Sequence, residues 1–325
     1  MTRSSKDLLL ASKEYAVEHR WLSWWHLAST VIIYAVLFAV TCLDLPIAVR
    51  IVTSVLSGLV LVRVFILYHD FEHGAILKGS RLAAAILNFY GIYALNPRSI
   101  WNRSHDHHHK NNSKIYGASI GSYPIMTRET YEQSSRWERF TYRISRHWLT
   151  IACGYLTIFI YGMCFRSLMV NPKRHWDSAL SLVVHTGLIV GLGLFISWQA
   201  VLLAVVIPFT IASAMGAYLF YAQHNFPGVQ FRSREEWNYV FAALQSSSYI
   251  RMNRLMSWFT GNIGYHHVHH LNALIPFYRL PEAMAALEEL QTPLTTSLRP
   301  RDVFNCLRLK LWETDTDTLV PLTKA

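Results

Sequence analysis

The sequence is poor in cysteine and in charged residues. Its 325 residues include four isolated cysteines and no Cys-x-x-Cys pair, so it lacks the pattern of a zinc ribbon, an iron–sulfur cluster or a dithiol redox site. Asp, Glu, Lys and Arg make up only 15% of the residues, below the roughly 25% that is usual in soluble domains. Hydrophobic residues reach 52%, and this balance is typical of a membrane protein.

Two further features are missing. No basic stripe lies at a distance from the hydrophobic segments, so the net charge of +10 does not indicate a nucleic-acid partner. The basic excess fits loops that face anionic lipid on the cytoplasmic side, or the docking of an acidic redox partner. Residues 1–20 are polar and charged and lack the apolar core of a secretory signal. We therefore expect this segment to stay in the cytoplasm.

The chain does have clustered histidines. Ten of its sixteen histidines lie in three windows, 69–73, 105–109 and 266–270, where the average frequency would place fewer than one. Their spacings of three and four residues bring side chains to one face of a helix. His107 and His267 fall off these faces. The eight candidates on them are His69, His73, His105, His108, His109, His266, His269 and His270.

These histidines predict a metal site. Imidazole suits iron, copper and zinc, and eight ligands exceed the four that one tetrahedral zinc takes. Eight or nine nitrogens fit two metal ions that each keep an open position. His224, where the last apolar stretch ends, is the ninth candidate. Asp70, Glu72 and Asp106 are candidates to orient the histidine rings, with a solvated position as the alternative for each.

Six apolar stretches predict the membrane architecture. The stretch 82–95 is too short to span, since a spanning helix needs about 20 residues. Basic residues flank 148–170 at both ends, so the positive-inside rule makes it interfacial or re-entrant. The four predicted spans are 27–43, 47–68, 179–198 and 200–222.

Two transmembrane hairpins place all three histidine windows on the cytoplasmic side, as a common site requires. We expect an all-α integral membrane protein of one domain, 1–325. It has four transmembrane helices in two hairpins, interfacial or re-entrant helices, and a cytoplasmic helical cap from 97–147 and 223–325 that carries the histidines. Pro281 is expected in the first turn of a short helix that begins at Leu280.

The windows read His-x-x-x-His, His-x-x-His-His and His-x-x-His-His. Together with the segments 220–224, 258–270 and 307–312, they resemble the membrane fatty acid desaturases, specifically the bacterial acyl-lipid type that includes omega-6 enzymes. The resemblance covers about residues 20–320. Related hydroxylases and carotenoid ketolases share single histidine windows of this kind, so the resemblance to the desaturases depends on all three windows together.

The resemblance implies a non-haem centre of two iron ions at the cytoplasmic membrane face, held by the eight window histidines with His224 as the ninth. It implies O2-dependent insertion of a cis double bond into an acyl chain carried by a membrane lipid, coenzyme A or an acyl carrier. The expected location is a bacterial inner membrane. No His-Pro-Gly-Gly haem signature is present, so the expected electron donor is a separate ferredoxin, flavodoxin or cytochrome b5.

An unactivated methylene offers no proton to a base, so a redox metal must carry the step. A tunnel must position the acyl chain, and Tyr68, Trp101 and Trp258 are candidates to line it, with ordinary interfacial aromatics as the alternative. A hydroxylase or ketolase would use the same ligands. A membrane metal transporter or sensor is the second alternative, but of the histidines only His185 lies well inside a predicted span.

Overall fold

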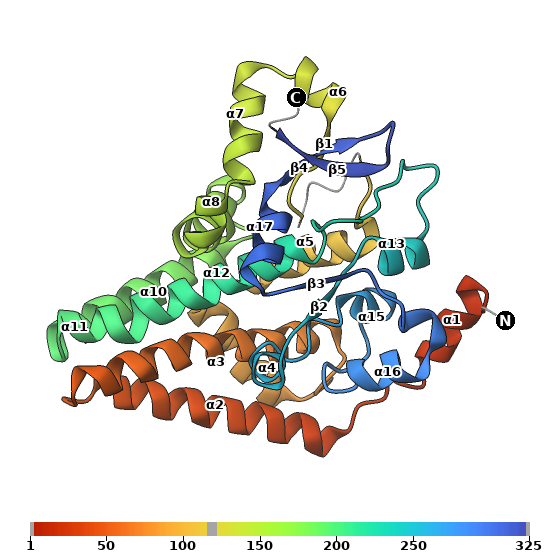
Figure 1. Cartoon of the computed structure of the whole chain (residues 1–325). Helices are drawn as coiled ribbons and strands as arrows, with labels where there is room; N and C mark the ends of the chain where they lie inside the picture. The colour runs from red at the N-terminus through yellow and green to blue at the C-terminus, as the bar shows by residue number, and fades with distance from the viewer. Residues whose placement is uncertain (1–2, 116–121, 323–325) are drawn as a thin grey trace.

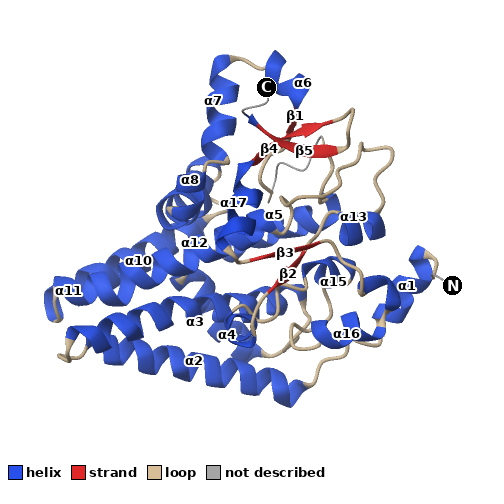
Figure 2. Cartoon of the chain, viewed as in Figure 1, coloured by secondary structure: helices blue, strands red, loops and turns tan. Residues whose placement is uncertain are grey.

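The computed structural model describes residues 3–115 and 122–322 and is mainly helical (Figures 1 and 2). Within these residues, four helices are long and apolar enough to cross a membrane. This confirms the predicted all-α membrane fold, and the chain is an integral membrane protein. The spanning helices are α2 (Arg20–Cys42), α3 (Ile47–His73), α10 (Trp176–Phe195) and the continuous helix Trp198–Ala222, which comprises α11 (Trp198–Val201), η2 (Leu202–Val206) and α12 (Ile207–Ala222).

The spanning helices form two hairpins whose turns lie at the same end of the bundle (Figure 1). Arg50 of α3 links the hairpins at that end, donating to the Thr41 carbonyl at 2.9 Å and to Gln199 Oε1 at 2.7 Å. Helices α3 and α12 approach closely at Gly58. A Cβ at Gly58 would lie 2.8 Å from Ile211 Cβ and 2.9 Å from the Pro208 carbonyl. The small residue therefore sets the distance between the hairpins.

Helix α3 runs five residues beyond the predicted span. It ends where Gly74 adopts a left-handed conformation with φ of 74°, which suits glycine at a helix C-terminus. His69 and His73 therefore lie on the spanning helix itself. The extension is polar in sequence, but protein rather than solvent surrounds it, so it remains helical.

The two shorter apolar stretches are not among the candidate spans. The first is α4 (Arg81–Tyr93). The second divides into α8, a π-helix η1 and α9. Figure 1 shows the coil at α8 nearly end-on, whereas α2 and α10 run across the view. This segment therefore lies across the spanning helices. Its parts are α8 (Trp148–Ala152), η1 (Tyr155–Arg166) and α9 (Ser167–Val170).

Short helices make up most of the cap at the other end of the bundle. Pro281 lies in the first turn of α16, as predicted. The helices are α1 (Ser5–Ser12), α5 (Arg98–Asn111), α6 (Arg128–Gln133), α7 (Arg136–Ser145), α13 (Tyr239–Gln245), α14 (Arg254–Phe259), α15 (His266–Leu271), α16 (Leu280–Ala286), η3 (Glu288–Leu290) and α17 (Pro300–Arg308).

The cap also contains short strands that the sequence did not predict. In the described residues they form a three-stranded sheet, ordered β1-β4-β5, and a parallel pair β2-β3. β1 is parallel to β4, and β4 is antiparallel to β5 with Trp312 opposite Leu319. Strands of two to five residues carry too little alternation to be recognised. They are β1 (Met126–Thr127), β2 (Tyr249–Arg251), β3 (Thr295–Ser297), β4 (Leu309–Glu313) and β5 (Thr318–Pro321).

The contact at Gly58 generates a stability prediction. We expect Gly58→Ala to lower the free energy of unfolding by about 1–3 kcal/mol, because the added methyl overpacks the interface. Gly187→Ala on α10 is the matched control, since a Cβ there meets nothing within 4 Å and alanine favours helix. The measurement is thermal unfolding of both full-length variants in detergent. Equal melting temperatures would contradict the close packing.

Candidate metal centre

The histidines converge where the end of α3, helices α5 and α15, and the segment after α12 meet. Two groups form among the described residues, and within each group the ligand atoms lie within 4.8 Å of one another. The five-histidine cluster contains His69, His73, His105, His109 and His269, and the four-histidine cluster contains His108, His224, His266 and His270.

Nitrogen atoms meet at the centre of the five-histidine cluster. His105 Nε2 lies 3.0, 2.9 and 3.1 Å from the Nε2 atoms of His69, His73 and His109, and His109 Nε2 is 3.2 Å from His269 Nε2. A neutral imidazole has one N–H, so hydrogen bonds between rings cannot account for all these contacts. Two nitrogens that each lie about 2.1 Å from one metal ion, with their bonds to it at a right angle, would be about 3.0 Å apart. The cluster therefore fits a metal ion.

The four-histidine cluster has the same spacing. His108 Nε2 lies 3.2 Å from His270 Nε2, and His266 Nε2 lies 2.9 Å from His224 Nε2. His224 comes from outside the three windows, at the end of the spanning helix Trp198–Ala222. The structure thus brings all nine histidines together, as two neighbouring groups.

Helix geometry explains how the second and third windows are divided between the clusters. Residues four apart supply one cluster, and the residue between them supplies the other. In α5, His105 and His109 join the five-histidine cluster while His108 joins the four-histidine cluster. In α15 the arrangement is reversed, because His266 and His270 join the four-histidine cluster. Each helix therefore bridges both clusters and holds them at a constant separation.

Burial keeps these rings neutral. Loss of solvation lowers the pKa of His224 to about 4, and that of His105 and His269 well below the usual value. Neighbouring imidazoles reinforce the effect, since a second positive charge nearby is unfavourable. Neutral imidazole is the form that binds metal, so the rings are ready to act as ligands.

Asp70 orients one of the rings. His69 Nδ1 donates to Asp70 Oδ1 at 3.0 Å, and the backbone N–H of Phe277 donates to Asp70 Oδ2 at 2.7 Å. With the proton held on Nδ1, His69 presents the lone pair of Nε2 to the cluster. The buried carboxylate also ties α3 to the segment after α15.

Two orienting groups were not predicted from the sequence. His108 Nδ1 lies 2.8 Å from Ser122 Oγ, and His224 Nδ1 donates to the carbonyl of Ser246 at 2.9 Å. Ser122 lies fourteen residues from its partner, and the group from Ser246 is a backbone carbonyl. No side-chain pattern in the sequence could signal either contact.

The other two acids have different surroundings. Glu72 Oε2 accepts from Arg98 Nε at 2.9 Å and from Asn102 Nδ2 at 2.6 Å, so it joins the end of α3 to α5. Asp106 is exposed and borders a surface cavity with Arg103. Among the contacts of the described residues, neither acid is bonded to a cluster histidine.

His107 and His267 lie outside both clusters. His107 is half-buried and borders the same surface cavity as Asp106. His267 is buried, and its Nε2 donates to the carbonyl of Leu290 at 3.2 Å. The spacing argument, which left these two residues off the ligand faces, agrees with their positions.

The predicted tunnel aromatics occupy three different environments. Tyr68 is fully buried, and its hydroxyl donates to the Asn96 carbonyl at 3.2 Å. Trp101 stacks on the ring of His105 at 4.3 Å. The guanidinium of Arg63 lies 4.3 Å from the centre of the Trp258 ring. None of these aromatics lines the cavity that does open beside a cluster.

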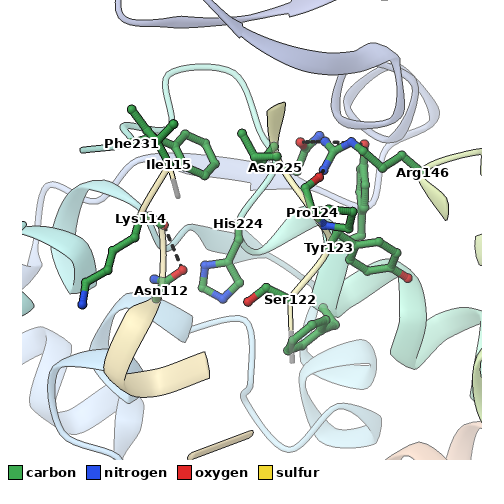
Figure 3. A pocket seen from close by; sticks show the side chains of 14 residues that line it. Asn112, Lys114, Ile115, Ser122, Tyr123, Pro124, Arg146, His224, Asn225 and Phe231 are labelled. Atoms are coloured by element: carbon green, nitrogen blue, oxygen red, sulfur yellow. Dashed lines mark hydrogen bonds between the residues drawn. The ribbon is translucent and has the colours of Figure 1, made fainter. Parts of the chain in front are cut away.

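That cavity lies beside His224 and has a volume of about 230 Å³ (Figure 3). Its wall includes Phe220, whose ring is 4.9 Å from that of His108, and the apolar side chains of Ile115 and Phe231. Arg146 borders it and donates to the Pro124 carbonyl at 2.7 Å. The four-histidine cluster is therefore reached through a partly apolar opening.

Fold and site together define a class, an integral membrane protein with a candidate metal centre of two histidine clusters at one end of a four-helix bundle. The model of the fatty acid desaturase family matches residues 45–300. The chain therefore belongs to the fatty acid desaturase family and is an oxidoreductase of that family. This confirms the resemblance seen in the histidine windows.

Named relatives agree with this assignment. The chain is 30% identical over 279 residues to the fatty acid desaturase of Bacillus subtilis (strain 168), covering 86% of this chain and 79% of the relative. It is 24% identical over 243 residues to the sn-1 acyl-lipid omega-3 desaturase (ferredoxin) of Nostoc sp. (strain 36), covering 72% and 66%. The chloroplastic omega-6 fatty acid desaturase of Spinacia oleracea is also 24% identical, over 72% of this chain and 52% of the relative.

Asp70 and Glu72 provide a matched pair of tests. We expect Asp70→Asn to weaken Fe(II) binding by about 10–100-fold, because the His69 ring loses the carboxylate that orients it. Glu72→Gln should change affinity little, since its contacts are with Arg98 and Asn102. Anaerobic Fe(II) titration of both full-length variants measures the difference. Equal affinities in the two variants would remove Asp70 from the site.

The lowered pKa values predict how metal retention depends on pH. Protons compete with metal only below the pKa of a ligand, and the pKa of His224 is about 4. Metal loaded into the clusters, with Fe(II) as the probe, should therefore be retained as the pH falls from 7 to about 5.5, where an ordinary histidine with a pKa of about 6.5 is mostly protonated. Iron remaining after anaerobic dialysis measures this, with a surface hexahistidine peptide as the control. Half-loss near the ordinary histidine pKa would show that the rings are not buried.

Proposed function

We propose that this chain inserts a cis double bond into the acyl chain of a membrane lipid, using O2, two iron ions and electrons from a separate donor. One observation carries the proposal, namely that nine buried or half-buried histidines divide into groups of five and four. Two groups fit two metal ions better than one tetrahedral zinc. Membership of the fatty acid desaturase family supports the same reaction.

The nine cluster histidines would hold the metal, five at one ion and four at the other. Imidazole is a good ligand for iron, and these groups leave room for exogenous ligands. When bound, iron supplies the redox chemistry that lets O2 remove two hydrogens from an unactivated methylene pair, which side chains alone cannot do.

The protein supplies position and a dry environment. Asp70, Ser122 and the Ser246 carbonyl hold the Nδ1 sides of His69, His108 and His224. Trp101 covers one face of His105. Rings fixed in this way lose little freedom when they bind metal, and their burial excludes water that would intercept reactive species.

We place the reacting part of the acyl chain in the cavity beside His224. Phe220, Ile115 and Phe231 offer it apolar walls, and each buried methylene contributes about 0.8 kcal/mol to binding. An acyl lipid is the proposed carrier and a ferredoxin the proposed donor, because the Nostoc relative is named for both. Flavodoxin and cytochrome b5 are the alternative donors.

The proposed location is the cytoplasmic face of a bacterial inner membrane. Both clusters lie at the end of the bundle opposite the hairpin turns, and arginines and lysines flank the segment 148–170 at that end, which favours the cytoplasm. We also propose that the chain works as one domain. Residues of the bundle (His69) and of the cap (His269) share one cluster.

The alternative functions are less well supported. A hydroxylase or ketolase would need the same ligands, so only the product distinguishes it. For a metal transporter, ionisable residues along the spans are expected. His185, deep in α10, is instead hydrogen-bonded to the hydroxyl of Tyr155.

Separate mutation of the clusters tests the metal assignment. We expect His269→Ala and His270→Ala each to remove about half of the bound iron and all desaturation, because each variant loses a ligand from a different ion. Iron per chain is measured by elemental analysis. Lipid products are identified by mass spectrometry in a host that supplies reduced ferredoxin.

His267→Gln, on the same helix, is the control and should keep both iron and activity, since glutamine can still donate to the Leu290 carbonyl. Wild-type activity in either cluster variant would refute the two-metal centre. A product that gains one oxygen instead of losing two hydrogens would make the chain a hydroxylase.

A further inference from the structure

Another cavity opens on the outer face of helix α7 and shares no lining residue with the cavity beside His224. Its volume is about 530 Å³. Three arginines border it together with apolar and aromatic side chains. The lining residues include Tyr131, Arg136, Arg139, Phe140, Arg143 and Ile144.

The three arginines lie on one stripe of α7, at spacings of three and four residues. In the described part of the chain, none of their guanidinium groups makes an ion pair. The nearby carboxylate on the same helix, Glu138, accepts the backbone N–H of Ser135 at 2.8 Å in a capping box and is not paired with an arginine. No carboxylate is among the described residues that line the cavity, so its lining is net positive.

An apolar stripe runs beside the basic one. Trp137 is 70% exposed, Phe140 53% and Ile144 47%, and their spacing puts them on one face of α7. The apolar surface continues into the membrane segment at Trp148 and Leu149, both exposed. In Figure 1, α7 runs upward from α8, whereas α2 and α10 run across the view. Helix α7 therefore does not run parallel to the spanning helices.

The opposite side of α7 is fixed to the cap. Tyr142 is buried, and its hydroxyl donates to the carbonyl of Lys310 on β4. Its ring packs at 5.8 Å from that of Tyr131, and Leu311 completes the small core. This attachment turns the arginines and the apolar stripe outward and keeps them in place.

We propose that this cavity binds the phosphate headgroup of an anionic membrane phospholipid. Guanidinium groups bind phosphate oxygens with strong, directional hydrogen bonds. The apolar stripe would enter the acyl region beside them, as in interfacial amphipathic helices. Continuity with the membrane segment favours lipid over a soluble acidic protein. The lipid is distinct from the reacting acyl chain, because no cluster histidine borders this cavity.

Native mass spectrometry of the full-length protein in uncharged detergent tests the site. Phosphatidylglycerol and phosphatidylcholine are the probes. Wild type should retain phosphatidylglycerol in preference to phosphatidylcholine. Replacement of Arg136, Arg139 and Arg143 by glutamine should weaken that retention by about tenfold or more. Neither readout needs iron or activity, so a failure of the proposed desaturation would leave this test intact.

The matched control replaces Lys6, Lys13 and Arg234, three exposed residues elsewhere on the cap, by glutamine and should retain the lipid normally. Equal loss in the control would reduce the effect to net charge and overturn the proposal. Displacement of phosphatidylglycerol by inorganic phosphate alone would identify a free-anion site. If the α7 variant instead keeps the lipid but raises the KM for ferredoxin, the surface is a donor dock and the lipid assignment is wrong.

Discussion

Nine imidazole rings can share one buried volume only if they stay uncharged and their nitrogens point inward. That requirement explains much of the surrounding architecture. It needs the end of α3 to remain helical beyond the apolar run, so that His69 and His73 reach the cap. It also needs α5 and α15 to present their histidines to each other, because each helix contributes rings to both clusters. Burial then lowers the pKa of the rings and leaves lone pairs for metal.

The spanning bundle supports this arrangement from one side and the cap supports it from the other. Close packing at Gly58 brings α3 and α12 together, and His73 and His224 lie at the cap ends of these two helices. Asp70 connects the bundle to the segment after α15. Because the candidate metal centre is built across these two layers, its geometry depends on their being held in place relative to each other.

Local sequence patterns predicted those parts of the fold and the site that depend on local physics. Helical spacing identified eight histidines and separated them from His107 and His267. Hydropathy predicted four spans. Two of the helices are longer than the predicted spans, since α2 begins at Arg20 and α3 ends at His73. The strands of the cap were missed, since their stability comes from pairing between distant segments such as β1 and β4. Ser122 and the Ser246 carbonyl were missed for the same reason.

The sequence by itself determined which histidines cluster, the helical faces that present them and the membrane setting, because each follows from interactions among near neighbours in the chain. Only the tertiary structure decided which ring belongs to which cluster. The packing of α5 against α15 places His108 with His266 and His270, and His269 with His105 and His109. Histidines on the same face of one helix therefore join different clusters. The cluster that each ring joins depends on the histidines that the other helix places opposite it.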